Sequence, residues 1–178
     1  ITAQHPCIGI EPSAILSFRD EIPQLVDDDQ REQALKLKEN CLLLDEFLLR
    51  EIKANHINKD LFTDKSEKIV LHGHCHQKSI AGISSTRQVL SFPMNYEVEL
   101  LPTGCCGMAG SFGYDKNHYN LSQEIANLVL YPRLLATKSK TIIAMNGTSC
   151  RHQIKDGIDR EGFHTAEIMY KALAKKNI

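Results

Sequence analysis

The segment KIVLHGHC, residues 68–75, joins a short run of β-branched and apolar residues to Gly73 and Cys75. An apolar run of this length, with polar residues before it and a glycine after it, predicts a buried strand. The next segment, QKSIAGISSTRQVLSF at residues 77–92, has the apolar spacing of a helix. This part of the chain is therefore expected to form a strand, a loop and a helix in that order.

Two later segments repeat this order. Residues 96–101 (YEVELL) resemble a strand and lead through a cysteine-containing loop to a helical segment at residues 120–135. Residues 140–150 (KTIIAMNGTSC) predict a third strand and loop, and a last helix follows near residues 165–175. Successive strand, loop and helix units favour crossover connections, so we predict an α/β fold with a mainly parallel sheet of repeated units.

The N-terminal part of the chain predicts helices. Apolar residues recur at steps of three and four from Asp27 to about Ala54, which indicates one long amphipathic helix. The preceding residues 11–25 predict a shorter helix that is opened by Pro12 and broken near Pro23.

The chain thus divides into two regions. We expect residues 1–60 to form a helical segment and residues 61–178 to form the α/β domain. The sequence begins at Ile1, without an initiator methionine, in a segment that resembles the middle of a polypeptide. We therefore expect the chain to be a C-terminal fragment of a longer protein.

The composition is typical of a globular domain, with 42% hydrophobic and 24% charged residues among 178. The 21 basic residues nearly balance the 22 acidic ones, so no strong overall charge would attract nucleic acid. No apolar stretch reaches the length of a membrane span. An α/β chain of this size needs no disulfides, so its six cysteines favour a cytoplasmic location, with peripheral association at the inner face of the membrane left open.

Four of the cysteines follow the carboxyl ends of the predicted strands. Cys75 follows the first strand, Cys105 and Cys106 follow the second, and Cys150 follows the third. Because the carboxyl ends of parallel strands share one edge of a sheet, we expect these thiols to converge. Thiolates bind iron–sulfur clusters and zinc, and adjacent cysteines suit two metal atoms of a cluster better than one tetrahedral ion. The four cysteines are therefore candidate metal ligands.

Residues beside these cysteines are candidates for contacts with a cofactor. Gly104 and Gly107 flank the cysteine pair, where they permit close approach of the backbone to a cluster. His74 and His76 flank Cys75, where imidazoles tune a cluster, pass protons or bind an anion; a solvated polar loop is the alternative. On an extended segment these two histidines would share one side and Cys75 would face away.

Other residues allow plainer interpretations. Cys41, on the apolar face of the predicted long helix, is expected to pack as a small hydrophobic residue. Cys7 is left open between packing and ligation of a neighbouring site. His72 belongs with the two histidines beside Cys75 to a segment that also suits zinc. Lys78 and Arg151 each follow a cysteine, where a cation offsets thiolate charge or orients an acidic substrate; a solvated side chain is the plainer alternative for each.

Three motifs, HGHCHQKS, LPTGCCGMAGSFGY and NGTSCRHQI, occur in this order. Together they resemble the cysteine-rich CCG domain found in heterodisulfide reductase and in the iron–sulfur subunits of glycolate oxidase and anaerobic glycerol-3-phosphate dehydrogenase. The resemblance is closest to the C-terminal part of FAD-linked D-2-hydroxyacid dehydrogenases of the D-lactate, glycolate and 2-hydroxyglutarate type. It spans about Ile69 to Gly157, and residues 8–21 resemble the segment that closes a preceding CCG repeat.

The resemblance implies electron transfer. FAD, held elsewhere in the polypeptide or in a partner protein, would oxidise a 2-hydroxyacid. An iron–sulfur cluster of the 4Fe-4S type would then pass the electrons to a quinone or another redox protein. Carried over to this sequence, its ligands are Cys75, Cys105, Cys106 and Cys150. The fragment alone is not expected to turn over substrate, and no dinucleotide-binding signature occurs in it.

The chain departs from the family pattern at two positions. The heterodisulfide reductase type closes with C-x-x-C, but Gln153 stands three residues after Cys150, so a fifth thiolate is missing. Relatives often read E-P-S-C in the earlier segment, where this chain has Ala14. An ordinary four-cysteine cluster, a zinc ion and an empty site are compatible with this set.

The sequence therefore supports one main hypothesis and two alternatives. The main hypothesis is an iron–sulfur domain of a flavin-linked oxidoreductase. The first alternative is a zinc-stabilised module that docks a partner and has no redox activity. The second is thiol redox chemistry at an activated cysteine, which the absence of C-x-x-C disfavours.

Overall fold

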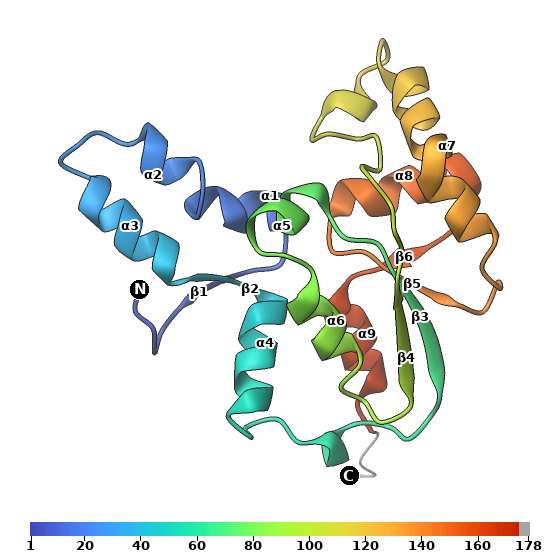
Figure 1. The fold of residues 1–178 in the computed structure, drawn as a ribbon, viewed down its shortest axis with the longest axis horizontal. Helices are drawn as coiled ribbons and strands as arrows, with labels where there is room; N and C mark the ends of the chain where they lie inside the picture. Colours follow the sequence, from blue (N-terminus) through green and yellow to red (C-terminus); the bar gives the residue numbers. More distant parts are fainter. Residues whose placement is uncertain (175–178) are drawn as a thin grey trace.

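The computed structural model describes residues 1–174 of the chain. Its larger sheet has four strands, all parallel, in the spatial order β4-β3-β5-β6 (Figure 1). The strands are β3 (Glu67–Leu71), β4 (Tyr96–Leu100), β5 (Ile142–Ala144) and β6 (Gly162–Phe163). The predicted α/β fold with a mainly parallel sheet is confirmed. β6 was not predicted, because two residues are too few to give a periodic pattern.

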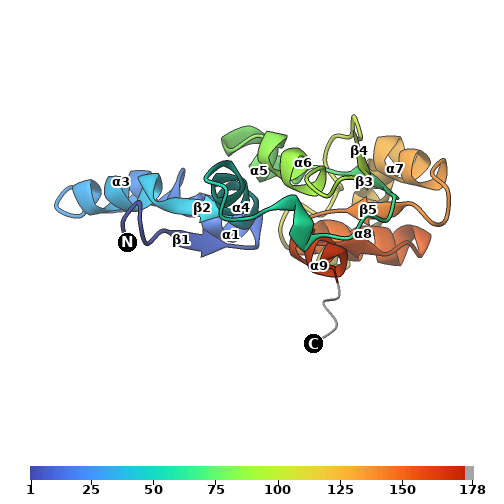
Figure 2. The same ribbon diagram turned by 90° about the horizontal axis from the view of Figure 1, so that it is seen from below.

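Helices cover both faces of this sheet, as Figure 2 shows. The helices after the strands are α5 (Cys75–Ile80), α6 (Ser84–Leu90), α7 (Tyr119–Leu135), α8 (Thr148–Ile158) and α9 (Thr165–Ala172), with the 3₁₀ turn η3 (Phe112–Tyr114). A further 3₁₀ turn, η2 (Lys59–Leu61), precedes β3. Ile69 and Leu71 pack with α6 and α9 on one face, whereas Val70 and Ile143 pack with α7 and α8 on the other. Alternate residues of β3 therefore enter different cores, as in a strand that is buried on both faces.

The helix boundaries differ from the predicted ones in three places. The predicted helix at residues 77–92 is divided into α5 and α6, because Gly82 adopts a positive φ of 73°. α8 begins at Thr148, so Cys150 lies in its first turn instead of in a loop. The last helix ends at Ala172, and Lys175, which the prediction included, lies outside the described residues.

The predicted long helix at residues 27–54 is wrong. These residues form α3 (Arg31–Glu39), the strand β2 (Cys41–Leu43) and α4 (Leu44–Lys53). β2 pairs in parallel with β1 (Cys7–Gly9) to make a separate two-stranded sheet. Pairing with a strand remote in sequence overrides the local helical pattern, which a three-residue strand is too short to interrupt visibly.

The shorter predicted helix is also divided. Residues 11–25 contain α1 (Pro12–Ile15), the 3₁₀ turn η1 (Leu16–Phe18) and α2 (Ile22–Leu25). Pro23 lies in the first turn of α2. It therefore begins a helix and does not break one, because the first turn requires no amide donor from that residue.

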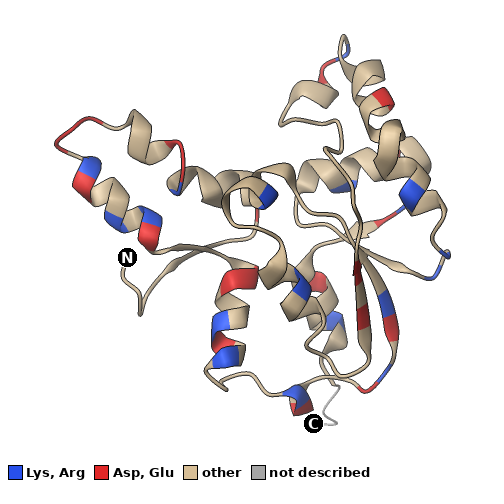
Figure 3. Ribbon diagram, viewed as in Figure 1, with Lys and Arg blue, Asp and Glu red and all other residues tan. Residues whose placement is uncertain are grey.

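Acidic and basic side chains are interspersed over the molecule (Figure 3), in keeping with a formal net charge of −1. Among the described residues, no helix is both long enough and apolar enough to cross a membrane.

A buried carboxyl group connects the N-terminal region to the larger sheet. Asp45 of α4 is 1% exposed, and its Oδ2 accepts hydrogen bonds from Thr86 Oγ1 and Asn146 Nδ2, both at 2.5 Å. Gln77 donates to Thr86, and Thr165 donates to the Oδ1 atom of Asn146. The network therefore joins α4 to α5 and α6, to the segment after β5 and to the start of α9.

Burial raises the pKa of Asp45 above its ordinary value, because desolvation of the carboxylate outweighs the hydrogen bonds from Thr86 and Asn146. A carboxyl group with a raised pKa in the folded state stabilises the fold fully below its unfolded-state pKa. That contribution is lost as the pH rises through the folded-state pKa. We expect the free energy of unfolding of Asp45→Asn, measured by urea denaturation between about pH 4 and pH 8, to decline less with pH than that of the parent. Parallel pH profiles for the two proteins would contradict this.

Candidate metal centre

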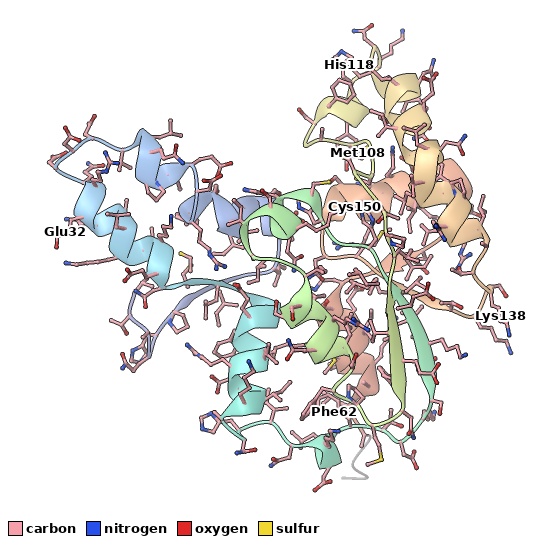
Figure 4. All side chains as sticks on the ribbon, viewed as in Figure 1. Glu32, Phe62, Met108, His118, Lys138 and Cys150 are labelled. Carbon is pink, nitrogen blue, oxygen red and sulfur yellow. The ribbon has the colours of Figure 1, made fainter. Side chains whose placement is uncertain are left out.

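The four cysteines that follow the strands lie together at the carboxyl edge of the larger sheet. Cys75 begins α5, Cys105 and Cys106 lie in the loop after β4, and Cys150 lies in α8. Figure 4 labels Cys150 at this edge, where α8 begins beside the loop that carries Met108. Cys75 lies within hydrogen-bonding reach of Cys105, Cys105 within reach of Cys106, and Cys106 within reach of Cys150. The fold therefore produces the predicted convergence.

A cavity of about 240 Å³ opens onto this group, and all four cysteines lie in its wall. Cys105 is exposed and Cys75 is partly buried. Cys106 and Cys150, in contrast, are only 3% and 1% exposed. The group therefore consists of an outer pair of thiols near solvent and an inner pair in the protein core.

His74 and His76 line the same cavity as Cys75. The prediction that Cys75 faces away from these histidines is wrong, because α5 begins at Cys75 and the segment is no longer extended there. His74 packs closely against Gly147, where an added Cβ would lie 2.4 Å from the His74 Cδ2 atom. His76 Nε2 lies 3.7 Å from a carboxylate oxygen of Glu21. Contact of either histidine with a cofactor stays a prediction.

His72 lies directly after β3, behind the thiols. It is 1% exposed, and one of its ring nitrogens lies within 4.8 Å of the Sγ atoms of Cys106 and Cys150. Its Nδ1 atom is 2.6 Å from Thr103 Oγ1. From the sequence, His72 was assigned only to a segment of three histidines around Cys75 that suits zinc. Its position at the end of a strand buried on both faces is the signal that distinguishes it from its neighbours.

The four thiols differ in how readily they ionise. Hydrogen bonds from Cys106 and Cys75 lower the pKa of Cys105. Hydrogen bonds from Cys106 and from His72 lower the pKa of Cys150. The bond to Cys105 raises the pKa of both Cys75 and Cys106, since each of them acts as the donor. Metal binding would displace the shared protons, because metals bind the thiolate form.

Two basic residues fix the loops that carry the cysteines. Lys78 Nζ donates to the carbonyl oxygens of Thr103 at 2.8 Å and of Gly104 at 3.1 Å. An Nη atom of Arg151 donates to the carbonyl oxygens of residues 145–146. Both side chains therefore hold backbone in place, and neither points freely at a substrate as the sequence suggested.

Gly107 and Gln153 hold the cysteine loop and α8 against α7. Gly107 has a φ of 94°, and a Cβ there would lie 2.2 Å from the carbonyl oxygen of Ser122. Its amide donates to Cys105 Sγ at 3.3 Å. Gln153, at the position of the missing fifth thiolate, donates to the same Ser122 oxygen at 2.9 Å. At Gly104, an added Cβ would meet no atom of the described residues within 4 Å.

The other two cysteines lie apart from this site. Cys7 and Cys41 are register partners in the smaller sheet and belong to a core with Ile15, Leu16 and Leu43. Cys41 is fully buried, and burial raises its pKa to about 11. Its predicted packing role is confirmed, although it lies in a strand and not in a helix. Ala14, at the place where relatives often have a cysteine, is exposed on α1.

Alanine substitutions at Gly104 and Gly107 are expected to have different effects on stability. We expect Gly107→Ala to destabilise the fold by about 1–3 kcal/mol, because it adds left-handed strain and a clash with backbone. We expect Gly104→Ala to change stability by less than about 0.5 kcal/mol. Thermal unfolding followed by circular dichroism checks both. Equal losses would mean that the close packing of the loop on α7 is absent in solution.

Comparison with known proteins finds relatives among dehydrogenases. The chain is 27% identical over 151 residues to D-2-hydroxyglutarate dehydrogenase of Pantoea ananatis, and 28% identical over 152 residues to that of Escherichia coli. Each match covers 84% of this chain and 14% of the relative. The chain is also 24% identical over 170 residues to one of the subunits of anaerobic glycerol-3-phosphate dehydrogenase of Escherichia coli, covering 95% of this chain and 41% of that relative.

These similarities relate the chain to dehydrogenases and their subunits. In each case it corresponds to less than half of the relative's length. No family model matches the chain, and no solved structure does. The resemblance to dehydrogenases is therefore confirmed, whereas the assignment to the CCG domain rests on the three sequence motifs.

Proposed function

We propose that this chain is the iron–sulfur electron-transfer part of a flavin-linked 2-hydroxyacid oxidoreductase. The observation that carries the proposal is the meeting of four thiols, from three separate segments of the chain, at one edge of the sheet. Relatives that are D-2-hydroxyglutarate dehydrogenases, and a relative that belongs to glycerol-3-phosphate dehydrogenase, support a role in dehydrogenation.

In this proposal the ligands are Cys75, Cys105, Cys106 and Cys150. Thiolates are the usual donors of iron–sulfur clusters, and adjacent cysteines can bind different iron atoms. The cavity over the thiols provides room for inorganic sulfide, and the amide of Gly107 already donates to a thiol sulfur. A bound cluster supplies reversible one-electron transfer.

The surrounding residues give the site an inner and an outer side. Cys106 and Cys150 would hold the cluster against the core, where water has little access. Cys105 is exposed, so redox partners would approach from its side. His74 and His76, in the cavity wall, are assigned contacts with the bound cofactor.

The partners follow from the same chemistry. FAD in another domain or protein would oxidise the hydroxyacid and pass electrons to this site. The acceptor would be a quinone or a further redox protein. We propose a cytoplasmic location, and a quinone acceptor would bring the protein to the inner face of the membrane.

We also propose that residues 61–178 carry the centre and that residues 1–60 close a preceding repeat of a longer protein. The N-terminal region does contribute to the site. Ser13 lies in the cavity wall, and Glu11 Oε2 accepts a hydrogen bond from the Thr148 amide at the start of α8, at 2.9 Å.

Anaerobic reconstitution with ferrous iron and sulfide tests the proposal. We expect broad absorption in the violet and equal amounts of iron and acid-labile sulfide, because thiolate-bound iron–sulfur clusters absorb there. The Cys105→Ser, Cys106→Ser double variant is expected to lose both signals. Cys7→Ser is the matched control and is expected to keep them, since Cys7 lies in the other sheet.

A zinc-stabilised docking module is the second candidate. It is favoured by the spacing of His72, Cys106 and Cys150, which suits one tetrahedral ion. Stoichiometric zinc without visible absorption, in protein purified from anaerobic cells, would replace the electron-transfer proposal with this one.

A further inference from the structure

The donor atoms at the strand edge divide into two sets by depth and spacing. A ring nitrogen of His72 and the Sγ atoms of Cys106 and Cys150 all lie within 4.8 Å of one another, and each residue is at most 3% exposed. Cys75 and Cys105 contact each other closer to solvent. A contact between Cys105 and Cys106 joins the two sets.

His72 has a ring nitrogen with no nitrogen or oxygen partner. Its Nε2 is buried and makes no hydrogen bond to a nitrogen or oxygen atom of residues 1–174, and the polar group beside it is the thiol of Cys150. Leaving a buried polar atom unsatisfied costs on the order of 1–3 kcal/mol, so such an atom in a folded protein requires an explanation. A metal atom bound at Nε2 would offset that cost.

The rest of the imidazole is held in place. Nδ1 lies 2.6 Å from Thr103 Oγ1, and the backbone amide of His72 donates to the Ala144 carbonyl oxygen at 3.0 Å. Thr103 is fixed in turn by Lys78, which donates to its carbonyl oxygen. A hydrogen bond at the second ring nitrogen is the usual way in which proteins orient a metal-binding histidine.

His72 also supplies a donor where the sequence motif lacks one. Gln153 stands at the place of the fifth thiolate, but its amide nitrogen donates to Ser122 O at 2.9 Å. Its amide oxygen accepts from Gln123 Nε2 at 3.0 Å. Both ends of this side chain are engaged with α7, whereas a His72 ring nitrogen lies beside the Cys106 and Cys150 thiols.

We propose that His72 is a fifth ligand of the metal centre and that it would hold the centre, through Nε2, on the buried side together with Cys106 and Cys150. Cys75 and Cys105 would hold it from the solvent side. This inference rests on the iron–sulfur function proposed above and adds a nitrogen ligand to it.

A nitrogen ligand changes the electronic properties of the centre. A neutral imidazole adds no negative charge, whereas a fifth thiolate would add one. Less negative charge favours the reduced state, so the reduction potential is higher than that of an otherwise equal five-thiolate centre. Replacing His72 with a cysteine is therefore expected to lower the potential.

Pulsed electron paramagnetic resonance of the unsubstituted protein tests the ligand directly. The protein, labelled with ¹⁵N-histidine, is reconstituted anaerobically with iron and sulfide and reduced with dithionite. We expect a ¹⁵N hyperfine coupling of the size that a directly bound imidazole gives. The coupling is expected to persist in His56→Ala, whose histidine is exposed and bonds Glu51 away from the site, and to disappear in His72→Cys. That variant keeps a metal donor and is expected to keep its iron and sulfide content.

The outcomes separate the two proposals. A cluster spectrum without a directly bound ¹⁵N, or with a coupling that survives in His72→Cys, overturns the assignment of His72 and leaves the four cysteines as ligands. If no cluster forms in the parent protein, both proposals are overturned.

Discussion

Parallel pairing of β3 with β4 and β5 is the constraint on which the rest of the structure depends. Leu71 at the end of β3 is in register with Leu100 of β4 and with Ala144 of β5, so three strands end at the same level. The segments that follow these strands carry all the candidate ligands, including His72. The register of the strands thus brings together residues that lie far apart in the sequence.

Packing around this edge converts proximity into a defined site. Lys78 and Arg151 hold the loop backbones through carbonyl oxygens, and the network around Asp45 joins the N-terminal region to the segment after β5. Ordered loops lower the entropic cost of assembling ligands around a metal. The buried inner donors and the exposed Cys105 then give a centre with one protected side and one side open to a redox partner.

The sequence predicted the parallel sheet and the meeting of the four thiols, because the apolar runs of β3 to β5 and the cysteines after them are local patterns. It failed where burial or remote pairing decides the outcome. The helical spacing around Cys41 concealed the strand that pairs with β1. His72 was grouped with His74 and His76, because its place directly after β3 is the one local signal and its depth and its bond to Thr103 appear only in the fold. The role of Gln153 depends on a contact with α7 that its neighbours in sequence do not reveal.

The central claim is that metal atoms bind at the carboxyl edge of this sheet. Diffraction from crystals grown anaerobically after reconstitution, recorded at the iron absorption edge, tests it most directly. The account predicts anomalous peaks within bonding distance of all four thiols, with one of them beside the His72 ring. Iron bound elsewhere on the chain, or four thiols that remain free of metal in protein shown to contain iron, would contradict it.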